Sequence, residues 1–390
     1  YKSISYTIKN LRDWSEKEYV QMPIYQIDSK GYYINEAYGS ALIISPFNYP
    51  FQLLIDPLIG ALASGNTAFL KPSRLTPNVN KILEIIINEN FNDEYIHFVK
   101  AEKGITSQLT KMNFDYIFFT GSTYVGKKVM SAASQNLVPI TLELGGKSPA
   151  IVDDNIDLNL VAKRIIWGKM INAGQTCIAP DYILVKKSKK KRLINEMIKV
   201  IEKFYGKEPK KSDDFGRIIS ERHFERLEKL IDQKKVVYGS KLDEEELYIS
   251  PTIMDNVELN DKVMQEEIFG PILPIITFEK YDEAFKIIRS FNKPLALYIF
   301  SESKKVQNAF IENIRFGGGC INDTLSHIIS TKLPFGGVGF SGIGNYHGKY
   351  SFETFSHKKS IVKKTTKFSN ALIYPPYDSK ILKLIKKIMK

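Results

Sequence analysis

Cys177 is the side chain best suited to nucleophilic chemistry. It ends the segment NAGQTC, residues 172 to 177, in which a glycine-containing loop follows an amphipathic helical stretch. Such a loop is mobile and accessible, as a cysteine nucleophile needs to be. The alternative is a small core residue, which many single cysteines are. We interpret the other cysteine, Cys320, as a core residue because it lies in the apolar run GCI.

Glu143 is a candidate general base. It lies in TLELGGK, residues 141 to 147, where a carboxylate interrupts an apolar strand and two glycines follow. Burial without a partner would raise its pKa toward neutrality, and a base that works near neutral pH needs such a pKa. The alternative is a structural salt bridge between Glu143 and Lys147.

Asn48 lies between two prolines in SPFNYP, residues 45 to 50, directly after a strand-like run. The G-x-G-x-x-G fingerprint of ordinary dinucleotide folds is absent from this position. Asn48 could simply serve turn formation. Alternatively, its amide is a rigid hydrogen-bond donor at the carboxyl end of a strand, where α/β proteins bind ligands.

A fourth candidate begins at Gly121 and Ser122. The apolar strand run FDYIFFT leads directly into GSTYVGKK, residues 121 to 128, and a helix. A strand-to-helix turn directs backbone N–H groups at a phosphate. The segment resembles a P-loop, but Lys128 stands where the Mg²⁺-binding Ser or Thr is required. A diphosphate bound without metal therefore fits better than the alternative, triphosphate hydrolysis.

The five histidines show neither metal-ligand spacing nor a sequence neighbour among the cysteines. We therefore expect no zinc or other metal site. The local sequence also gives no support for a Cys–His hydrolase.

Strand-like runs alternate with helical ones along the chain, and this pattern predicts an α/β fold with mainly parallel sheets. Expected strands are residues 40–45, 67–71, 94–99, 114–120, 140–144, 182–186, 295–300 and 319–322. Expected helices are residues 51–63, 76–88, 122–134, 157–171, 189–204, 281–291 and 304–314. Asp157 and Thr76 are the expected N-caps, with Pro77 in a first helical position. A hairpin is expected over residues 26–37, turning at DSKG.

Composition narrows the class of protein. The 390 residues are 43% hydrophobic and 25% charged, which is ordinary for soluble globular proteins and excludes a disordered chain. No apolar run reaches the roughly 20 residues of a membrane span. Two cysteines cannot form a disulfide framework, and the start YKS shows no secretory signal, so we expect a cytoplasmic location.

The net charge of +12 is concentrated at the C-terminus, where residues 358 to 390 contain ten lysines and one acid. The body is nearly neutral, so we expect no nucleic-acid groove. From residue 381 to 390, apolar residues recur at i, i+3, i+4 and i+7, with lysines between them. This basic amphipathic helix predicts peripheral contact of residues 380–390 with an anionic membrane. The alternative is a helix docked on the body or a solvated tail.

These segments, taken together, resemble the aldehyde dehydrogenases, most closely the class 3 branch that includes fatty aldehyde dehydrogenase. The matching motifs follow the family's order over about residues 40 to 360: SPFNYP, LKPS, FTGS, LELGGKSP, GQTC, EEIFGP and PFGG. YHGK and SFETFSH, between residues 346 and 357, are similar to class 3 in particular.

The resemblance implies an aldehyde dehydrogenase-like α/β fold and four regions. These are a Rossmann-type NAD(P)-binding domain at 1–142 with a dimerisation hairpin at about 24–38, a catalytic domain at 143–335, a returning segment with a dimerisation strand at 336–365, and the basic tail at 366–390. It also implies a homodimer. Family chains start further upstream with helices that pack on the cofactor domain, so we expect an N-terminally incomplete chain.

The resemblance also assigns the chemistry, which is oxidation of a medium- or long-chain or aromatic aldehyde to its carboxylic acid. Cys177 would attack the aldehyde, and Asn48 with the Cys177 backbone N–H would stabilise the oxyanion of the thiohemiacetal. Hydride transfer would leave a thioester, and Glu143 would activate the water that hydrolyses it. Relatives that pass the acyl group to coenzyme A often lack this glutamate. A non-catalytic relative would be expected to lose Cys177, Glu143 or Asn48, and all three are present.

The cofactor implied is NAD or NADP. Glu267 would bind the nicotinamide ribose and Phe269 would pack near the ring. Ser122, after Gly121, would meet the diphosphate, and Lys71 the adenosine ribose. Class 3 members usually have Glu after KPS, and this chain has Arg74. A cation there can accept a 2′-phosphate, so Arg74 favours NADP unless it points into solvent.

Overall fold

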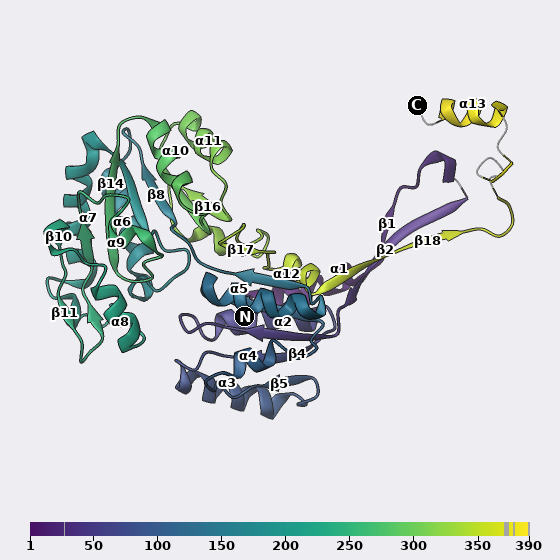
Figure 1. Ribbon diagram of the computed structural model, residues 1–390, viewed down its shortest axis with the longest axis horizontal. Helices are drawn as coiled ribbons and strands as arrows, with labels where there is room; N and C mark the ends of the chain where they lie inside the picture. The colour runs from purple at the N-terminus through teal and green to yellow at the C-terminus, as the bar shows by residue number, and fades with distance from the viewer. Residues whose placement is uncertain (27, 370–373, 377–378, 389–390) are drawn as a thin grey trace.

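The computed structural model describes residues 1–390 except 27, 370–373, 377–378 and 389–390. The chain forms two lobes, each built around its own sheet, and a long arm that extends away from both (Figure 1). Strand β7 (Ile140–Glu143) of the first sheet ends at Glu143, and strand β8 (Pro149–Val152) of the second sheet begins at Pro149. The chain therefore passes from the first lobe to the second just after Glu143.

The first lobe has six strands in the order β17-β7-β6-β3-β4-β5. All neighbours are parallel except β17, which pairs antiparallel with β7. The strands are β3 Ser40–Ile44, β4 Thr67–Lys71, β5 Ile96–Phe98, β6 Tyr116–Thr120, β7 Ile140–Glu143 and β17 Gly342–Ile343. The helices are α2 Gln52–Ala63, α3 Pro77–Asn90, α4 Ile105–Leu109 and α5 Thr123–Ala133.

The second lobe has seven strands in the order β10-β13-β14-β9-β8-β15-β16, parallel except between β10 and β13. The strands are β8 Pro149–Val152, β9 Tyr182–Lys186, β10 Val236–Tyr238, β13 Thr252–Met254, β14 Ile272–Phe278, β15 Ala296–Phe300 and β16 Gly318–Ile321, and a separate pair is β11 Leu242–Asp243 with β12 Tyr248–Ile249. The helices are α6 Leu158–Met170, α7 Lys190–Tyr205, α8 Glu221–Glu228, α9 Lys262–Gln265, α10 Tyr281–Ser290 and α11 Lys304–Asn313.

The central strands are buried on both faces, and this explains their continuous apolar sequences. All five residues of β6 and of β15 are buried, as expected for parallel strands covered by helices on both sides. Polar groups therefore appear mainly where strands end. Both lobes thus present loops at the carboxyl ends of their strands, where α/β proteins bind ligands.

The arm is a three-stranded antiparallel sheet, β1-β2-β18. Its strands are β1 Glu18–Val20, β2 Ser29–Ala37 and β18 Ser356–Lys364. The expected hairpin over residues 26–37 was wrong in its strands, because residues 29–31 of the expected turn lie within β2 and pair with β18. The hairpin partner of β2 is β1, which lies upstream of residue 26.

Two further helices flank the arm, α12 Lys349–Thr354 at its base and α13 Ser379–Ile388 beyond its far end (Figure 1). A helix that we did not predict, α1 Lys2–Ser15, also packs near the base. Its Trp14 ring lies 5.8 Å from Phe352 of α12. No helix among the described residues is long and apolar enough to cross a membrane.

Candidate active site

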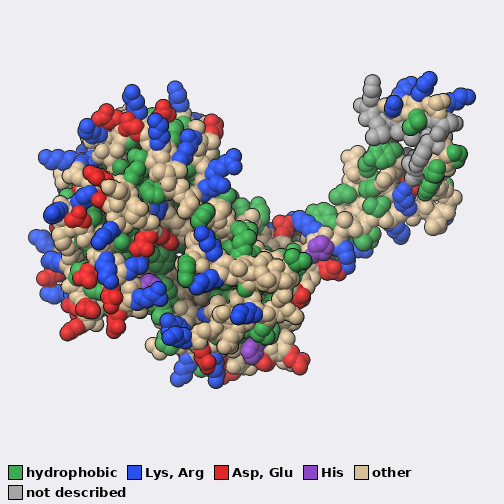
Figure 2. Space-filling view, viewed as in Figure 1, with side chains coloured by type: hydrophobic (Ala, Val, Ile, Leu, Met, Phe, Trp, Pro, Cys, Tyr) green, Lys and Arg blue, Asp and Glu red, His purple; other side chains and the backbone are tan. Residues whose placement is uncertain are grey.

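A cavity of about 440 Å³ lies where the two lobes meet. The space-filling view is hollowed in this region (Figure 2). The first lobe contributes Pro46, Phe47, Asn48, Leu53, Thr120, Gly121, Ser122, Thr123, Tyr124, Glu143, Leu144 and Gly145, and the second contributes Cys177, His223, Arg226, Glu266, Glu267 and Phe269. The structure thus brings together seven of the nine predicted site residues. They are Asn48, Gly121, Ser122, Glu143, Cys177, Glu267 and Phe269.

The loop that carries Cys177 has an unusual backbone. After α6, Asn172, Ala173 and Gly174 have φ values of 51°, 50° and 76°, which fall in the left-handed region. Two of the three are not glycine, and non-glycine residues adopt this conformation at a cost of about 1–2 kcal/mol each. A Cβ on Gly174 would lie 2.2 Å from the Gly270 carbonyl oxygen, so glycine alone fits there. The loop is strained, and its contacts must hold it.

Hydrogen bonds from both lobes hold this loop. The Asn48 Nδ2 donates to the Gln175 carbonyl at 3.0 Å, and the Asn172 Nδ2 donates to the Asn48 carbonyl at 3.0 Å. The Tyr49 hydroxyl and the Thr176 Oγ1 are 2.7 Å apart. Asn48 is thus tied directly to the nucleophile loop. Its amide nitrogen carries two hydrogens, and this bond within the described chain uses one.

Burial, followed by the carboxyl groups of Glu267 and Glu143, raises the pKa of the Cys177 thiol to about 12, against the lowering effect of the backbone N–H groups of Cys177 and Ile178. The thiol is therefore neutral near pH 7. The thiol must therefore lose its proton as it attacks.

Glu143, at the end of β7, is 2% exposed. Neither carboxylate oxygen has a hydrogen-bond partner within the described part of the chain. Burial raises its pKa well above 4.5. The alternative salt bridge is not present, because Lys147 pairs with Asp181 at 2.5 Å instead. Glu143 thus has the properties of a poised base.

Glu267 and Phe269 enter the cavity from the loop after α9. Burial, followed by the nearby Asp181, raises the pKa of Glu267 to about 8, while the Gly146 N–H opposes this shift. Arg226 fixes the loop by donating to the Ile268 carbonyl at 2.6 Å. The Phe269 ring packs edge-on against Phe47, with centroids 5.8 Å apart.

The opposite end of the cavity suits a diphosphate. Ser122 is the N-cap of α5, and its Oγ accepts from the Val125 N–H at 3.4 Å. The other N–H groups of this first turn and the helix dipole favour an anion. Thr120 adds a buried Oγ1 without a hydrogen-bond partner among the described residues. Gly145 also lines the cavity, and only glycine fits at this position, since a Cβ there would lie 1.9 Å from a Glu267 carboxylate oxygen. These features fit a dinucleotide.

Lys71 and Arg74 do not line this cavity. Lys71 ends β4 and is half-buried, and Arg74 is exposed just beyond it. The pKa of Lys71 is lowered by burial and then by the charge of Arg74, which shows that the two cations are near each other. Together they form a small basic patch at the carboxyl end of β4, outside the cavity.

The P-loop alternative has no support in the side chains. The Lys127 Nζ lies 4.4 Å from the centroid of the Phe340 ring, and the Lys128 Nζ lies 4.3 Å from that of Tyr124. Neither lysine lines the cavity, whereas a P-loop lysine must reach the phosphates.

No group of three metal-ligating side chains occurs among the residues that the structure describes. The local sequence indicated no histidine partner for either cysteine, but spatial pairing was left open. The structure shows such a contact for Cys320, whose Sγ lies 3.4 Å from the Nδ1 of His327 on the loop after β16. Burial lowers the pKa of His327 to about 4 and raises that of Cys320, so the pair is neutral.

Sequence reasoning missed two groups near the site. Tyr49 and Thr176 form one of the hydrogen bonds between the lobes, but nothing in their spacing indicates this contact. Lys169 is 0% exposed at the end of α6. The sequence could have indicated that Lys169 is buried, because it continues the apolar stripe of Ala162 and Ile165 at helical spacing.

The fold and the site define an oxidoreductase that pairs a thiol nucleophile with a dinucleotide pocket. Residues 2–361 match the family model described as "Aldehyde dehydrogenase family". The chain is 50% identical to 4,4'-diaponeurosporen-aldehyde dehydrogenase of Staphylococcus aureus (strain NCTC 8325 / PS 47), covering 100% of this chain and 85% of that protein. It is 45% identical to the mouse (Mus musculus) "Aldehyde dehydrogenase, dimeric NADP-preferring", covering 97% of this chain and 84% of that protein.

A solved structure described as the substrate-bound state of Staphylococcus aureus AldH superposes with a TM-score of 0.97 at 50% identity, covering 100% of this chain and 85% of that one. The chain belongs to the aldehyde dehydrogenase family. It is an NAD(P)-dependent enzyme that oxidises an aldehyde to a carboxylic acid.

Proposed function

We propose that Cys177, Asn48 and Glu143 carry out this oxidation in the cavity between the lobes. The observation that supports the assignment best is the cavity itself. It is lined by the Cys177 thiol, by Asn48, whose amide bonds the loop of that thiol, and by Glu143, whose buried carboxylate has no hydrogen-bond partner among the described residues.

In the first half-reaction the Cys177 sulfur bonds to the aldehyde carbon, and the carbonyl electron pair moves to oxygen. The free N–H of the Asn48 amide and the Cys177 backbone N–H donate to this oxyanion, as fixed donors do in other oxyanion holes. The thiol proton must pass to a base, because burial raises the thiol pKa to about 12. Asn48 is already fixed by the Gln175 carbonyl, so its amide does not have to reorient.

NAD or NADP, when bound, would accept the hydride that leaves the former aldehyde carbon, and this loss leaves a thioester on Cys177. Glu267 would accept from the nicotinamide ribose, Phe269 would pack beside the ring, and the first turn of α5 after Gly121 and Ser122 would hold the diphosphate. In the second half-reaction Glu143 takes a proton from water, whose oxygen adds to the thioester carbon. The carbon–sulfur bond then breaks, and the acid leaves.

The function is tested with Cys177→Ser. A hydroxyl preserves the shape but lacks the nucleophilicity of a thiol, so aldehyde oxidation should be lost while NAD(P) binding persists. Initial rates and cofactor titrations of the same samples measure both. Cys320→Ser is the matched control and should retain activity. Substantial turnover by Cys177→Ser would overturn the mechanism.

We propose that the substrate is a medium- or long-chain or aromatic aldehyde. The supporting feature is the apolar wall beside Cys177, formed by Pro46, Phe47, Leu53 and Phe269. Apolar surface favours a substrate that buries CH₂ groups at about 0.8 kcal/mol each. A kcat/KM that stays flat from acetaldehyde to decanal would contradict this proposal.

We propose that NADP is used at least as well as NAD, because Arg74 adds a second cation beside Lys71 where the adenosine ribose would lie. Arg binds phosphate through a planar set of donors, whereas an acid in this position would repel it. The mouse relative's printed name, NADP-preferring, points in the same direction for that protein.

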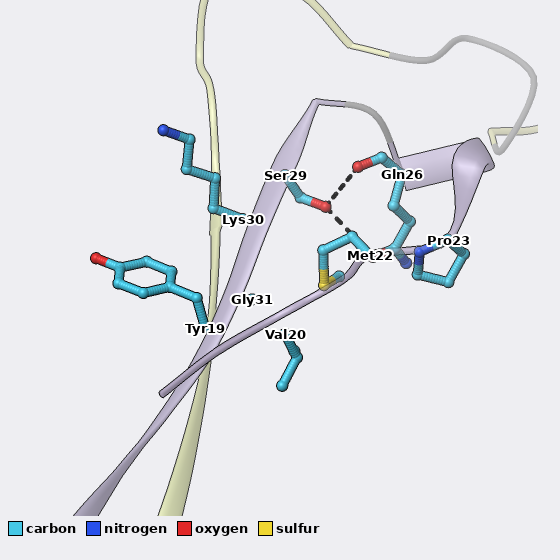
Figure 3. A pocket seen from close by; sticks show the side chains of 8 residues that line it. All are labelled: Tyr19, Val20, Met22, Pro23, Gln26, Ser29, Lys30 and Gly31. Atoms are coloured by element: carbon cyan, nitrogen blue, oxygen red, sulfur yellow. Dashed lines mark hydrogen bonds between the residues drawn. The ribbon is translucent and has the colours of Figure 1, made fainter. Parts of the chain in front are cut away.

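We propose a homodimer formed through the arm. The exposed fraction is 69% for Tyr19 and 55% for Val362, which is high for large apolar side chains. At the tip, a cavity of about 280 Å³ lies between β1 and β2 (Figure 3). β18 is an edge strand in the described arm sheet, and open edges favour pairing with another chain. A dimer would cover these surfaces.

We further propose a cytoplasmic enzyme that contacts membranes through residues 380–390. Lysine side chains gather around α13 at the far end of the arm (Figure 2). Residues 389 and 390, and the side chains of Ile381, Leu384, Ile385 and Ile388, lie outside what the structure describes. The apolar face of this helix therefore rests on the sequence pattern.

A further inference from the structure

Cys177 lies in a tight turn of four residues. The turn runs from residue 176 to residue 179 and is closed by the Ala179 N–H, which donates to the Thr176 carbonyl at 3.0 Å. Cys177 and Ile178 are its central residues, and the backbone N–H groups of both lower the pKa of the thiol. Because these N–H groups stabilise negative charge on the sulfur, the shape of the turn affects how readily the thiol reacts.

A tyrosine hydroxyl from each lobe holds this turn. The Tyr49 hydroxyl, from the first lobe, lies 2.7 Å from the Thr176 Oγ1. The Tyr298 hydroxyl, from β15 of the second lobe, donates to the carbonyl of Ile178. One contact is made to the residue before Cys177 and the other to the residue after it. The nucleophile is therefore anchored on both sides.

Packing alone does not explain the tyrosine at position 298. Tyr298 is 0% exposed in the middle of β15, whose five residues are all buried. Its partners in the sheet register are Ala150 on β8 and Cys320 on β16, which are small and leave room for an aromatic ring. A phenylalanine would fill this room without the cost of burying a hydroxyl. The hydroxyl is therefore the part of the side chain that calls for an explanation.

The Tyr298 hydroxyl acts as a donor. Burial raises its pKa well above 10, so it keeps its proton near neutral pH. A phenol has one O–H to donate, and the Ile178 carbonyl accepts it. The adjacent Cys320 thiol has its own contacts at 3.4 Å, with the Ser326 hydroxyl and the His327 ring. The contact with Ile178 is thus the specific task of the Tyr298 hydroxyl.

We infer that Tyr298 is a positioning residue for the nucleophile, whose hydroxyl fixes the Ile178 carbonyl and thereby the turn that presents the Cys177 sulfur to the aldehyde. The inference rests on the proposed role of Cys177. Tyr298 does not line the cavity, so it acts through the Ile178 backbone and not on the substrate. Asn48 and Tyr49 hold the loop of Cys177 from the first lobe, and Tyr298 is their counterpart in the second.

Tyr298→Phe tests this role, because it removes the hydroxyl and keeps the ring. Alkylation of Cys177 by iodoacetamide, followed by mass spectrometry of the peptide that contains it, measures the reactivity of the thiol. We expect alkylation to be about tenfold slower, the effect of a rise of one unit in the thiol pKa. The first hydride transfer at saturating aldehyde, measured by stopped flow, should slow by a similar factor. The dissociation constants of NAD⁺ and NADP⁺ should stay unchanged.

Tyr281→Phe is the matched control. The Tyr281 hydroxyl also belongs to the second lobe and donates to a buried group, the Asp153 carboxylate, at 2.6 Å. Asp153 follows the carboxyl end of β8, whereas the Cys177 turn precedes the amino end of the parallel strand β9. This variant should lose stability in urea denaturation, yet alkylate and transfer hydride as the wild type does.

Wild-type alkylation or an unchanged first hydride transfer in Tyr298→Phe would overturn the inference. Equal slowing in Tyr281→Phe would also overturn it, because the effect would then be one of general stability. Substantial turnover by Cys177→Ser refutes the proposed function instead, whatever Tyr298→Phe does. If Tyr298→Phe does not fold, Tyr49→Phe frees the same turn from the first lobe, and unchanged alkylation in that variant would then count against the inference.

Discussion

At the scale of single residues, the site depends on groups that are buried without partners. The Glu143 carboxylate and the Lys169 ammonium are both buried and lack hydrogen-bond partners among the described residues. Stability alone would favour apolar replacements for each. Glu143 lines the same cavity as Cys177, and a base must keep its lone pairs free for a proton. The absence of partners at Glu143 therefore fits a general base.

Glu143→Gln should separate the two half-reactions. An amide cannot accept a proton from water, so hydrolysis of the thioester should slow by about 10²-fold or more while the first hydride transfer remains. Stopped-flow absorbance of the reduced cofactor would show a burst followed by slow turnover. In the wild type, the slow phase should accelerate as pH rises through the raised Glu143 pKa, because only the ionised form is a base. Equal loss of burst and steady rate would contradict this role.

Arg74→Glu should shift cofactor preference toward NAD. An acid repels the 2′-phosphate of NADP and can accept from the 2′-hydroxyl of NAD. The ratio of kcat/KM for the two cofactors measures the shift, which we expect to be at least about tenfold. Lys81→Glu, the same change of charge on exposed α3, should leave the ratio unchanged. An unaltered ratio in Arg74→Glu would show that Arg74 points into solvent and does not bind the cofactor.

At the scale of elements, the sequence predicted several parallel strands of both lobes well. β4 and β9 agree with the expected residues, because buried parallel strands are continuous apolar runs. α2, α5 and α6 also agree within a residue or two. Asp157 caps α6 as expected, but the Thr76 side chain forms no cap hydrogen bond with α3.

The strands that were missed differ in sequence. β13 and β8 are three and four residues long, too short for a pattern of their own. β14 contains a proline, which weakens a strand prediction. The seven predicted residues that line the cavity were found through motifs, but their proximity depends on how the two lobes pack. A motif does not show how far the end of a strand lies from a cavity, so the sequence did not show that Lys71 and Arg74 lie outside it.

Gly174→Ala tests the strained loop as an element. The new Cβ would meet the Gly270 carbonyl at a φ of +76°, so both the backbone and the contact oppose it. Gly206 is the matched control, because its φ is +74° and no described atom lies within 4 Å of its Cβ position. Gly206→Ala should cost about 1–2 kcal/mol in backbone strain alone.

Gly174→Ala should lose more stability than this control and should also slow alkylation of Cys177 by iodoacetamide. Urea denaturation and alkylation rates measure the two effects. Equal stability losses, with unchanged alkylation, would show that the contact with Gly270 does not position the nucleophile.

At the scale of the whole molecule, the arm is the feature that a single chain does not explain. It extends far from both lobes (Figure 1), with large apolar side chains exposed on a narrow sheet. Val362→Lys, on β18, should weaken a homodimer through the arm. Light scattering after size exclusion should show a shift from dimer to monomer at micromolar concentration. Leu137→Lys, on an 89% exposed position of the first lobe, is the control and should remain dimeric. A wild-type chain that runs as a monomer would contradict the proposal directly.

The basic tail gives the last prediction. Deleting residues 380–390 should abolish binding to vesicles that contain anionic lipid. Turnover of water-soluble aldehydes should stay unchanged, because α13 lies beyond the far end of the arm, away from both lobes (Figure 1). Binding by the full chain should fall as salt rises, since each lysine near an anionic surface contributes about 1 kcal/mol that salt screens. Replacing Lys383, Lys386 and Lys387 by Gln keeps the apolar spacing and should lose most of the binding. If that variant binds fully, the apolar face dominates. If the truncated chain binds as well as the full one, the tail has no membrane role.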